Sequence, residues 1–376
     1  MKKILLYSDA KHLGGHELQT FNALQLLQDK YEIVFIVFKG NKNFIELLNT
    51  LNIKIIQIEY SSNRFQILRT FFSLIHIYRL IKIIKELKPN LILNIQGNIE
   101  LGSVMLLASK ISKVKNITYI PICHKLSEVT NNGWIAKIKD FINVFYYKMP
   151  DAFITLNDFN RHLIKQRGVD KPIYIVLNGI DFDKNIIYDK LEAKNKLGLD
   201  STQTNVALIG RIQFWHKGHD ILINMVKKHI NQLENYKFVI VGTGEDENNM
   251  KNILKEYHVE NKFLFLGHQK DLSLIYSAID SVIIPSRFES GAGTPMVLLE
   301  ALYYQLPIVM TNLPDMDLYL GEDCLFEKEN IDDFFKKLIL IENKNIDIDI
   351  KNKIVNIHSV AKFQKNFFNV IEENVK

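Results

Sequence analysis

The residues best suited to chemistry lie in a glycine-bearing loop that leads into a predicted helix. Gly291 and Gly293 stand ahead of Thr294 and Pro295. Threonine caps helix amides well and proline suits the first helical position, so the sequence predicts a helix over residues 295–304. Glycine lets a ligand come close to the backbone, and the free amides of a helix start attract anions. We therefore expect this loop to bind a phosphate group.

Two glutamates flank the same loop, Glu289 before it and Glu300 inside the predicted helix. Glu300 would sit more than one turn into the helix, where its carboxylate can reach a ribose hydroxyl beside a bound phosphate. The alternative is that both glutamates are solvated surface acids and that the glycines only form a turn. The residues of this loop leave both interpretations open.

Two cations lie earlier in the same half of the chain. Arg211 follows Gly210 at the end of the predicted strand 206–209, and Lys217 comes six residues later, before a predicted helix. Two permanent cations at a strand end can stabilise the charge that builds on a departing nucleoside diphosphate without a metal ion. Taken alone, such a pair is also compatible with an ordinary surface feature.

Tandem glycines, Gly14 and Gly15, come directly after the first predicted strand and before a helix. They permit close backbone approach to a substrate. The loop is neither the three-glycine dinucleotide fingerprint nor a phosphate-binding Walker loop, because the required Gly and Lys-Ser/Thr positions are absent.

Three further positions follow predicted strands. His124 comes at the end of an apolar run and could bond a sugar hydroxyl, although a structural role fits its position equally well. Gly242 and Gly267 lie in loops that could contact a nucleotide base or serve only as turns.

Short apolar runs alternate with helix-period segments along the whole chain, which is typical of parallel sheets covered by helices. The predicted strands are residues 4–7, 33–38, 53–58, 91–94, 117–120 and 152–155, then 206–209, 238–241, 263–266, 281–284 and 308–310. Predicted helices between the first strands include residues 17–29, 64–87 and 134–147.

The strand pattern restarts after the turn at Asn178-Gly179. We therefore predict an α/β protein with two doubly wound, Rossmann-like domains, residues 1–178 and 179–357. The end of the chain, about 349–375, has helical periodicity, and a helix at about 358–376 is expected to pack back on the first domain. Two such sheets imply a cleft, with ligands beyond the carboxyl ends of the strands.

The composition excludes several classes of protein. The chain has 376 residues and a formal charge of +5 with scattered lysines, so no nucleic-acid partner is expected. Cys123 and Cys324 match no metal or redox spacing, which suggests a reducing, cytoplasmic setting. Asp9 and Lys11 interrupt the apolar start too early for a signal peptide, and no apolar run approaches the roughly 20 residues that span a bilayer.

Taken together, these motifs resemble the family 4 retaining glycosyltransferases of the two-domain GT-B fold, and the resemblance covers nearly the whole chain. The matching segments, in order, are residues 14–17, 124, 178–181, 210–211, 217–220, 241–244, 265–267, 285–289 and 298–301.

The resemblance implies a nucleotide-sugar donor, UDP- or GDP-linked, held mainly by the second domain. In that family pattern Arg211 and Lys217 bind the diphosphate, Glu300 binds the ribose and Glu289 binds hydroxyls of the transferred sugar.

The resemblance also implies that the first domain holds the acceptor, a glycan or a lipid-linked saccharide. His124 would contact the reacting sugar, and the Gly14-Gly15 loop would approach the phosphates and the acceptor. Transfer would retain the anomeric configuration, with the leaving phosphate taking the acceptor proton. No cofactor is implied.

The chain departs from the family pattern between its two glutamates, where the loop is three residues longer than usual. The usual spacing counted back from Glu300 reaches Ala292, which has no carboxylate. Because residues 286–289 are intact and the extra residues are small, we expect Glu289 to keep its place. If that contact is lost, a non-catalytic sugar-binding partner of another transferase becomes the alternative. A nucleotide-sugar epimerase or a phosphorylase of the same architecture is a further alternative.

Three Asp-x-Asp pairs, at 181–183, 315–317 and 347–349, could suggest a metal-dependent transferase. That class has a single nucleotide-binding domain, which conflicts with the duplicated strand series. We interpret these aspartates as turn and capping residues and expect no metal requirement.

The predicted helix 64–88 combines Arg69, Arg79, Lys82 and Lys85 with many apolar side chains. Such a helix could lie on an anionic membrane, near a lipid-linked acceptor. Alternatively, its apolar stripe packs on the sheet and the cations form the solvated face.

Overall fold

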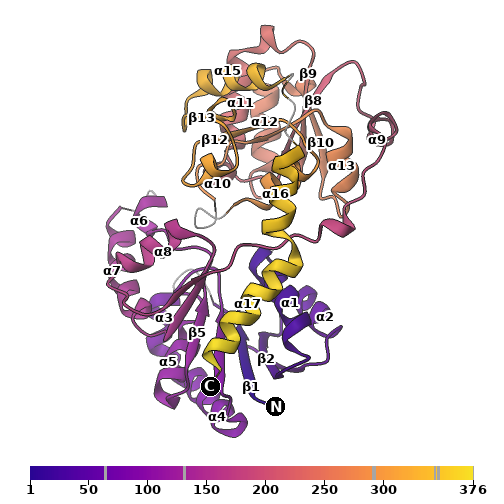
Figure 1. The fold of residues 1–376 in the computed structure, drawn as a ribbon. Coiled ribbons are helices and arrows are strands. Elements are labelled where there is room, and N and C mark those ends of the chain that lie inside the picture. The colour runs from indigo at the N-terminus through magenta and orange to yellow at the C-terminus, as the bar shows by residue number, and fades with distance from the viewer. Residues whose placement is uncertain (63–65, 130–132, 290–293, 343, 345–347, 376) are drawn as a thin grey trace. The chain divides into compact units, whose positions relative to one another are not determined.

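The computed structural model describes residues 1–62, 66–129, 133–289, 294–342, 344 and 348–375. The chain forms two compact units (Figure 1). Unit 1 comprises Met1–Gly179 and Val360–Lys376, and unit 2 comprises Ile180–Ser359. Within the described ranges, every helix is too short or too polar to span a bilayer.

Unit 1 is built on a parallel sheet, seven-stranded within the described residues, with the strand order β3-β2-β1-β4-β5-β6-β7. Its strands are β1 Lys3–Ser8, β2 Glu32–Phe38, β3 Lys54–Ile58, β4 Leu91–Ile95, β5 Asn116–Tyr119, β6 Ala152–Thr155 and β7 Ile173–Ile175. Its helices are α1 Gly15–Leu27, α2 Lys42–Leu48, α3 Gln66–Phe72, α4 Leu74–Leu87, α5 Ser103–Ser112, α6 Leu126–Val129, α7 Gly133–Tyr147, α8 Asp158–Lys165 and α17 Val360–Asn374.

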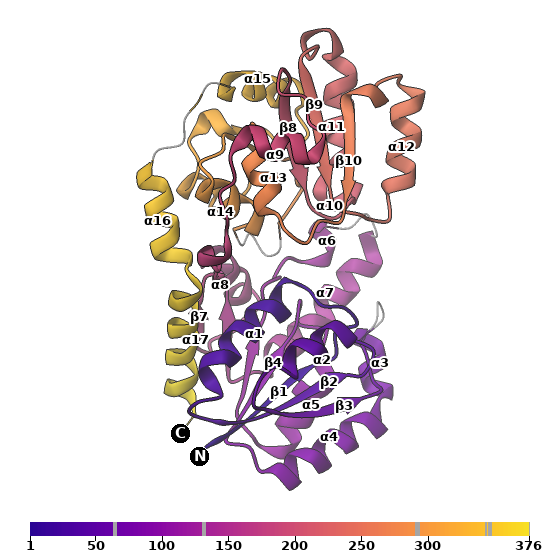
Figure 2. The same cartoon turned by 90° about the vertical axis from the view of Figure 1, so that its right-hand side faces the viewer.

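Alternate residues of the central strands enter different cores, because successive side chains of a strand point to opposite faces. Ile4 and Leu6 of β1 pack in the core that includes residues of α1 and α17. Leu5 and Tyr7 pack in the core formed with α4 and α5. Figure 2 shows α1 and α2 covering one face of the sheet and α4 and α5 covering the other. Both faces are therefore buried, which explains the continuous apolar runs of the sequence.

The C-terminal helix α17 completes the first core. Phe363 and Phe367 are buried, and the Phe367 ring lies edge-on to Tyr119 with 5.7 Å between centroids. A Cβ on Gly179 would stand 2.6 Å from the Cβ of Phe363, so only glycine fits where the chain passes this helix. The Gln19 side chain donates to the Gly179 carbonyl at 2.8 Å and accepts from its amide at 2.9 Å. The turn at Gly179 is therefore bonded to α1 through Gln19 and packs against α17 through Phe363.

Two predicted helices are each divided in the structure. The predicted helix 64–88 is α3 and α4, separated by Ser73, whose hydroxyl donates to the Arg69 carbonyl at 2.7 Å and lies 3.1 Å from the Tyr60 hydroxyl. The predicted C-terminal helix is α16 Ile348–His358 followed by α17. The break falls at Ser359, where the Ile180 amide donates to the His358 carbonyl at 2.7 Å. At both breaks the chain makes a hydrogen bond to a residue outside the helix. Ser73 bonds Tyr60, and His358 bonds Ile180.

Unit 2 has a parallel sheet with the order β10-β9-β8-β11-β12-β13. Its strands are β8 Thr204–Ile209, β9 Tyr236–Val241, β10 Phe263–Gly267, β11 Ser281–Ile284, β12 Ile308–Thr311 and β13 Leu325–Phe326. Its α-helices, besides α16, are α9 Lys190–Leu197, α10 Phe214–Lys217, α11 His219–Lys228, α12 Glu247–Glu256, α13 Ser273–Ala278, α14 Met296–Tyr303 and α15 Ile331–Ile341. Short 3₁₀ turns occur at 182–184, 230–232, 260–262, 316–318 and 322–324.

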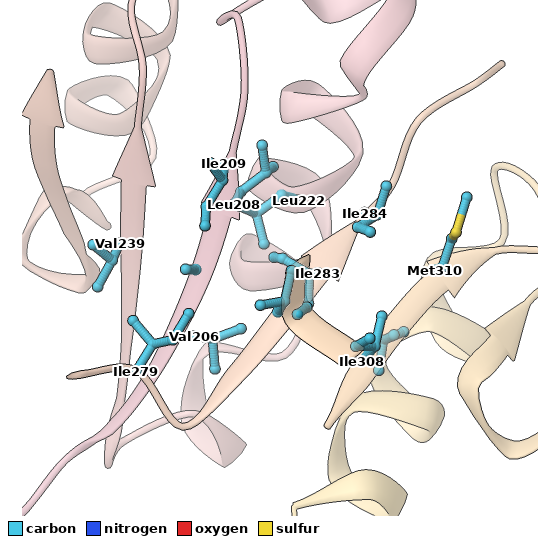
Figure 3. Close-up of a cluster of buried hydrophobic side chains, with 14 of the residues drawn as sticks. Val206, Leu208, Ile209, Leu222, Val239, Ile279, Ile283, Ile284, Ile308 and Met310 are labelled. Atoms are coloured by element: carbon cyan, nitrogen blue, oxygen red, sulfur yellow. The ribbon is translucent and has the colours of Figure 1, made fainter. Parts of the chain in front are cut away.

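The core of unit 2 lies where β8, β11 and β12 meet the helices (Figure 3). Val206, Ile283 and Ile308 come from these three strands, and Leu222 comes from α11. All are essentially without exposed surface. The predicted two-domain parallel α/β fold is confirmed. The short strands β7 and β13, at the edges of the two sheets, were not predicted.

Candidate active site

In unit 2, the loops at the carboxyl ends of neighbouring strands touch one another. Gly242, after β9, donates its amide to the Gly267 carbonyl at 2.7 Å, and Ile212, after β8, donates to the Thr243 carbonyl at 3.1 Å. A Cβ on Gly242 would stand 2.0 Å from the Gly210 carbonyl oxygen. These glycines therefore allow three loops to meet where a ligand of a parallel sheet binds.

The loops after β8 and β11 bring Lys217 to Glu289. Lys217 is the last residue of α10, and its Nζ donates to both carboxylate oxygens of Glu289, at 2.7 and 2.8 Å. Glu289 is only 5% exposed. Burial raises the pKa of Glu289, but the ammonium of Lys217 more than offsets this, so that its pKa lies below the ordinary value. At neutral pH the site therefore holds an ionised, buried pair.

Gly218 makes this approach possible. It has φ +69°, and a Cβ there would stand 2.0 Å from the carbonyl oxygen of Pro285. The end of α10 consequently packs directly on the backbone that follows β11.

Arg287 fastens the same loop to its surroundings. Its guanidinium donates to both oxygens of Asp220 at 2.7 Å and to Glu329 at 2.6 and 3.0 Å. Its backbone amide donates to the His216 carbonyl at 2.8 Å. The hydrogen bonds that Arg287 donates to Asp220, with a smaller contribution from those to Glu329, raise the pKa of Arg287. Two residues before Glu289, the ion pairs of Arg287 with Asp220 and Glu329 therefore fix the position of the loop.

His216 is neutral at physiological pH. Its ring stacks on Phe288, with 4.4 Å between centroids and 12° between planes. Burial, and next the charge of Lys217, lower its pKa to about 4. The positive charge of this region therefore comes from lysine and arginine.

Arg211 is exposed beside this pair, and among the described residues it makes no ion pair. It directly follows Gly210, and a Cβ on Gly210 would stand 3.9 Å from the Cε of Lys217. The backbone just before Arg211 thus lies close to the side chain of Lys217. An anion bound there would meet a guanidinium with unused donors.

Glu300 is held on α14 by a residue that sequence reasoning missed. Tyr276 of α13 donates its hydroxyl to the Glu300 carboxylate at 2.6 Å. Burial raises the pKa of Glu300, while the bond from Tyr276 opposes that rise. Neither Glu289 nor Glu300 is the freely solvated surface acid that the alternative interpretation required.

Thr294 does not cap α14, contrary to the sequence prediction. The helix begins at Met296, and Pro295 is the capping residue, with φ −57° and ψ 136°. The Pro295 carbonyl accepts the first bonds, from the amides of Leu298 and Leu299. Gly291 and Gly293 lie outside the described residues.

The remaining predicted residues belong to unit 1. Gly14 precedes α1, and its amide donates to Glu17 at 2.9 Å, while Gly15 is the first residue of the helix. His124 follows β5, with its ring 5.7 Å from that of Phe159. All three lie at the carboxyl edge of the unit 1 sheet.

A group of buried polar side chains at this edge was not predicted. The strand order places the topological switch point between β1 and β4, the usual place for a ligand. Asp9 follows β1 and is buried, and burial raises its pKa to about 6. Gln96 follows β4 and is 2% exposed, yet neither of its amide atoms has a hydrogen-bond partner among the described residues. Nearby, the Oδ1 atom of Asn94 is also buried and has no hydrogen-bond partner among the described residues. The sequence signal that could have predicted this group is the presence of a polar residue, Asp9 or Gln96, directly after each of two central strands.

In the part of the chain that the structure describes, no group of three or more His, Cys, Asp or Glu residues could hold a metal ion. Cys123 and Cys324 are free and buried.

Two parallel-sheet units of this kind define the GT-B architecture, and solved structures agree. HepE from Anabaena, crystallised with UDP, matches with a TM-score of 0.78 and 16% identity, over 99% of this chain and 100% of HepE. Residues 13–184 match the sequence profile of Glycosyltransferase Family 4, and residues 189–356 match that of Glycosyl transferases group 1. The chain belongs to the family 4 glycosyltransferases.

Two curated relatives illustrate the family. An uncharacterized glycosyltransferase of Haemophilus influenzae is 27% identical over 362 residues, which cover 94% of each chain. The UDP-Gal:alpha-D-GlcNAc-diphosphoundecaprenol alpha-1,3-galactosyltransferase of Escherichia coli is 28% identical over 256 residues, covering 62% of this chain and 63% of the relative.

Proposed function

We propose that this glycosyltransferase moves a sugar from a UDP- or GDP-linked donor to a lipid-linked saccharide during assembly of a cell-surface glycan, with retention of configuration. The ion pair of Lys217 and Glu289, at the carboxyl edge of the unit 2 sheet, is the observation that carries this proposal. The E. coli relative, named for a UDP-sugar donor and a diphosphoundecaprenol acceptor, supports the donor and acceptor classes.

The two cations would bind the donor diphosphate. Lys217 has three N–H donors and directs two contacts to Glu289, so one remains for a phosphate oxygen. Arg211 contributes an exposed guanidinium. The sequence prediction that the loop with Gly291, Gly293 and Thr294 binds the diphosphate is kept as part of this proposal.

Bond breaking at the sugar places negative charge on the departing phosphate. Arg211 and Lys217 stabilise that charge as it develops, so no metal ion or other cofactor is needed in this step. The acceptor hydroxyl attacks from the face that the phosphate leaves, its proton passes to the departing phosphate oxygen, and the new glycosidic bond keeps the original configuration.

The carboxylates would orient the donor. Glu289 stays ionised because Lys217 lies beside it, so its oxygens can accept from hydroxyls of the transferred sugar. Glu300, with Tyr276 on one oxygen, would accept from a ribose hydroxyl. Gly242 and Gly267 would let the base lie against the backbone.

Unit 1 would supply the acceptor side. Gly14, Gly15 and His124 lie at the carboxyl edge of its sheet, together with the buried polar side chains of Asp9 and Gln96. A saccharide offers the hydroxyl donors and acceptors that the unpartnered amide atoms of Gln96 lack.

The decisive experiment screens UDP- and GDP-sugars for a rise in melting temperature, since a cognate donor binds only the folded protein. The stabilising donor is then given with a lipid-diphosphate saccharide, and the product anomer is assigned by NMR. Retention, with full activity in EDTA, supports the proposal. Inversion or a strict manganese requirement overturns the mechanism. Conversion of the donor without acceptor indicates an epimerase, and binding without turnover indicates a non-catalytic partner.

A further inference from the structure

Unit 1 exposes an unusual number of large apolar side chains on neighbouring helices. We name as the α3–α7 surface the exposed side chains of Phe71, Phe72, Leu74, Ile75, Tyr78, Trp134, Ile135, Ile138, Phe141 and Phe145. Phe72 is 86% exposed and Phe141 is 81% exposed. An apolar area of this extent marks an interaction site, because water solvates it poorly.

The α7 part of the surface is a regular stripe. Trp134, Ile138, Phe141 and Phe145 follow one another at intervals of four, three and four residues, so they share one face of the helix. The buried residues of α7, Ala136, Asn143, Tyr146 and Tyr147, occupy the opposite face. The helix is therefore apolar on both sides, and only one side is used inside the unit.

The α3 and α4 part adjoins this stripe. The Phe71 ring at the end of α3 lies 6.3 Å from that of Tyr146 on α7, and α4 follows α3 after a single residue. Figure 2 shows α3 beside α7, with α4 continuing along the same side of the unit. On α4 the core stripe is Ile77, Leu80 and Ile84. The sequence alternative, that the apolar stripe packs on the sheet, thus holds for these three, but not for Leu74, Ile75 and Tyr78.

Cations border the apolar side chains. Lys82 and Lys85 lie on the same outward face of α4 as Leu74 and Tyr78, and Lys137 and Lys148 flank the α7 stripe. Of the acids, Asp140 already accepts from the amides of Leu126 and Ser127. Glu86 lies 3.9 Å from Lys82. The charge that borders this surface is therefore predominantly positive.

A groove joins the two kinds of residue. Its lining includes the apolar side chains of Phe72 and Ile75 and the guanidinium groups of Arg69 and Arg79, together with Tyr60, Ser73 and His76. Guanidinium groups next to apolar side chains suit a phosphate headgroup that is attached to acyl chains.

We propose that the α3–α7 surface binds the face of an anionic lipid bilayer, with its aromatic side chains in the interfacial region and its lysines and arginines on lipid phosphates. Trp and Tyr favour that region, and basic side chains near anionic lipid add to binding. A second copy of the chain is the other possible occupant, but its surface would bring the same positive border into contact with this one. The inference does not depend on which sugar is transferred.

The test is co-sedimentation of the full chain with phosphatidylglycerol-containing vesicles and with pure phosphatidylcholine vesicles. The wild type should bind the anionic vesicles, and binding should weaken as salt increases. Phe141→Glu with Ile75→Glu should reduce the partition coefficient at least tenfold. Removing one lysine, as in Lys82→Gln or Lys137→Gln, should reduce it about fivefold.

Matched controls come from unit 2. Leu318 and Leu340 are 63% and 52% exposed there, so Leu318→Glu with Leu340→Glu adds the same charges outside the surface and should leave binding unchanged. Melting temperatures of both double variants establish that they fold. The inference is overturned if the wild type does not bind anionic vesicles, if the surface variant binds as the wild type does, or if Phe141→Glu instead abolishes a dimer detected by sedimentation. Because no sugar donor is added, failure here is distinct from failure of the proposed transfer.

Discussion

Lys217 and Glu289 form a buried ion pair in which one ammonium contacts both carboxylate oxygens, although 72 residues separate them in sequence. Removing one partner leaves the other charge buried without compensation. We expect Lys217→Ala to lower the free energy of unfolding by about 3 kcal/mol, the low end for a buried pair because Lys217 retains some exposure. Activity should fall about a hundredfold to a thousandfold, as on loss of a charge-stabilising donor. Denaturant titration and kcat/KM measure the two effects.

The double variant Lys217→Ala with Glu289→Ala separates these roles. It should recover part of the lost stability, because no buried charge remains unpaired, yet recover no activity. If the double variant instead loses as much stability as the two single variants together, the pairing is contradicted.

His219 is expected to make stability depend on pH. Burial lowers its pKa to about 4, against about 6.5 in an unfolded chain, so the unfolded state binds the proton first as pH falls. Its contribution is complete above pH 6.5 and is lost progressively towards pH 4. Between those values, the free energy of unfolding of His219→Gln should fall about 1.4 kcal/mol less per pH unit than that of the wild type. Denaturant titrations across this range measure the slopes.

We expect Arg287 to stabilise the protein through the paired hydrogen bonds of its guanidinium, and not through its charge alone. In Arg287→Lys the charge stays, but the paired bonds to Asp220 are lost. We expect a loss of about 1–2 kcal/mol of stability, discounted for partial exposure, and weaker donor binding as the Glu289 loop loosens. Isothermal calorimetry with the donor nucleotide measures that binding. Arg161→Lys, on an exposed pair with Asp158, should change neither quantity appreciably.

Gly218 and Gly198 provide a controlled comparison of crowding. Their φ values are +69° and +68°, but a Cβ on Gly198 would meet no atom within 4 Å, whereas one on Gly218 would clash with Pro285. Gly198→Ala should cost about 1 kcal/mol from backbone strain. Gly218→Ala should cost about 1–3 kcal/mol more and reduce activity, because α10 must withdraw with Lys217. Equal melting temperatures would contradict this account.

Apolar runs predicted the strands well because both faces of these sheets are buried. The strands Ala152–Thr155 and Ser281–Ile284 have the predicted bounds. The edge strands β7 and β13 have three and two residues, too few to show a pattern. The breaks at Ser73 and Ser359 depend on hydrogen bonds to distant residues, which a local period does not contain.

For the site, the sequence predicted which strand ends carry polar residues but not which side chains meet. Tyr276 was missed because its partner, Glu300, stands on another helix. Gln96 was missed because an amide after a strand has no distinctive spacing. The roles assigned to the predicted site residues stay predictions until donor binding is measured.

The position of Phe363 and Phe367 has a consequence for biogenesis. These rings fill the core of unit 1 but come after unit 2 in the sequence, whereas unit 2 is one continuous stretch. During translation, all of unit 2 is synthesised before α17, so unit 2 can complete its core before α17 packs on the sheet of unit 1. The N-terminal half therefore stays incompletely packed until α17 has been synthesised.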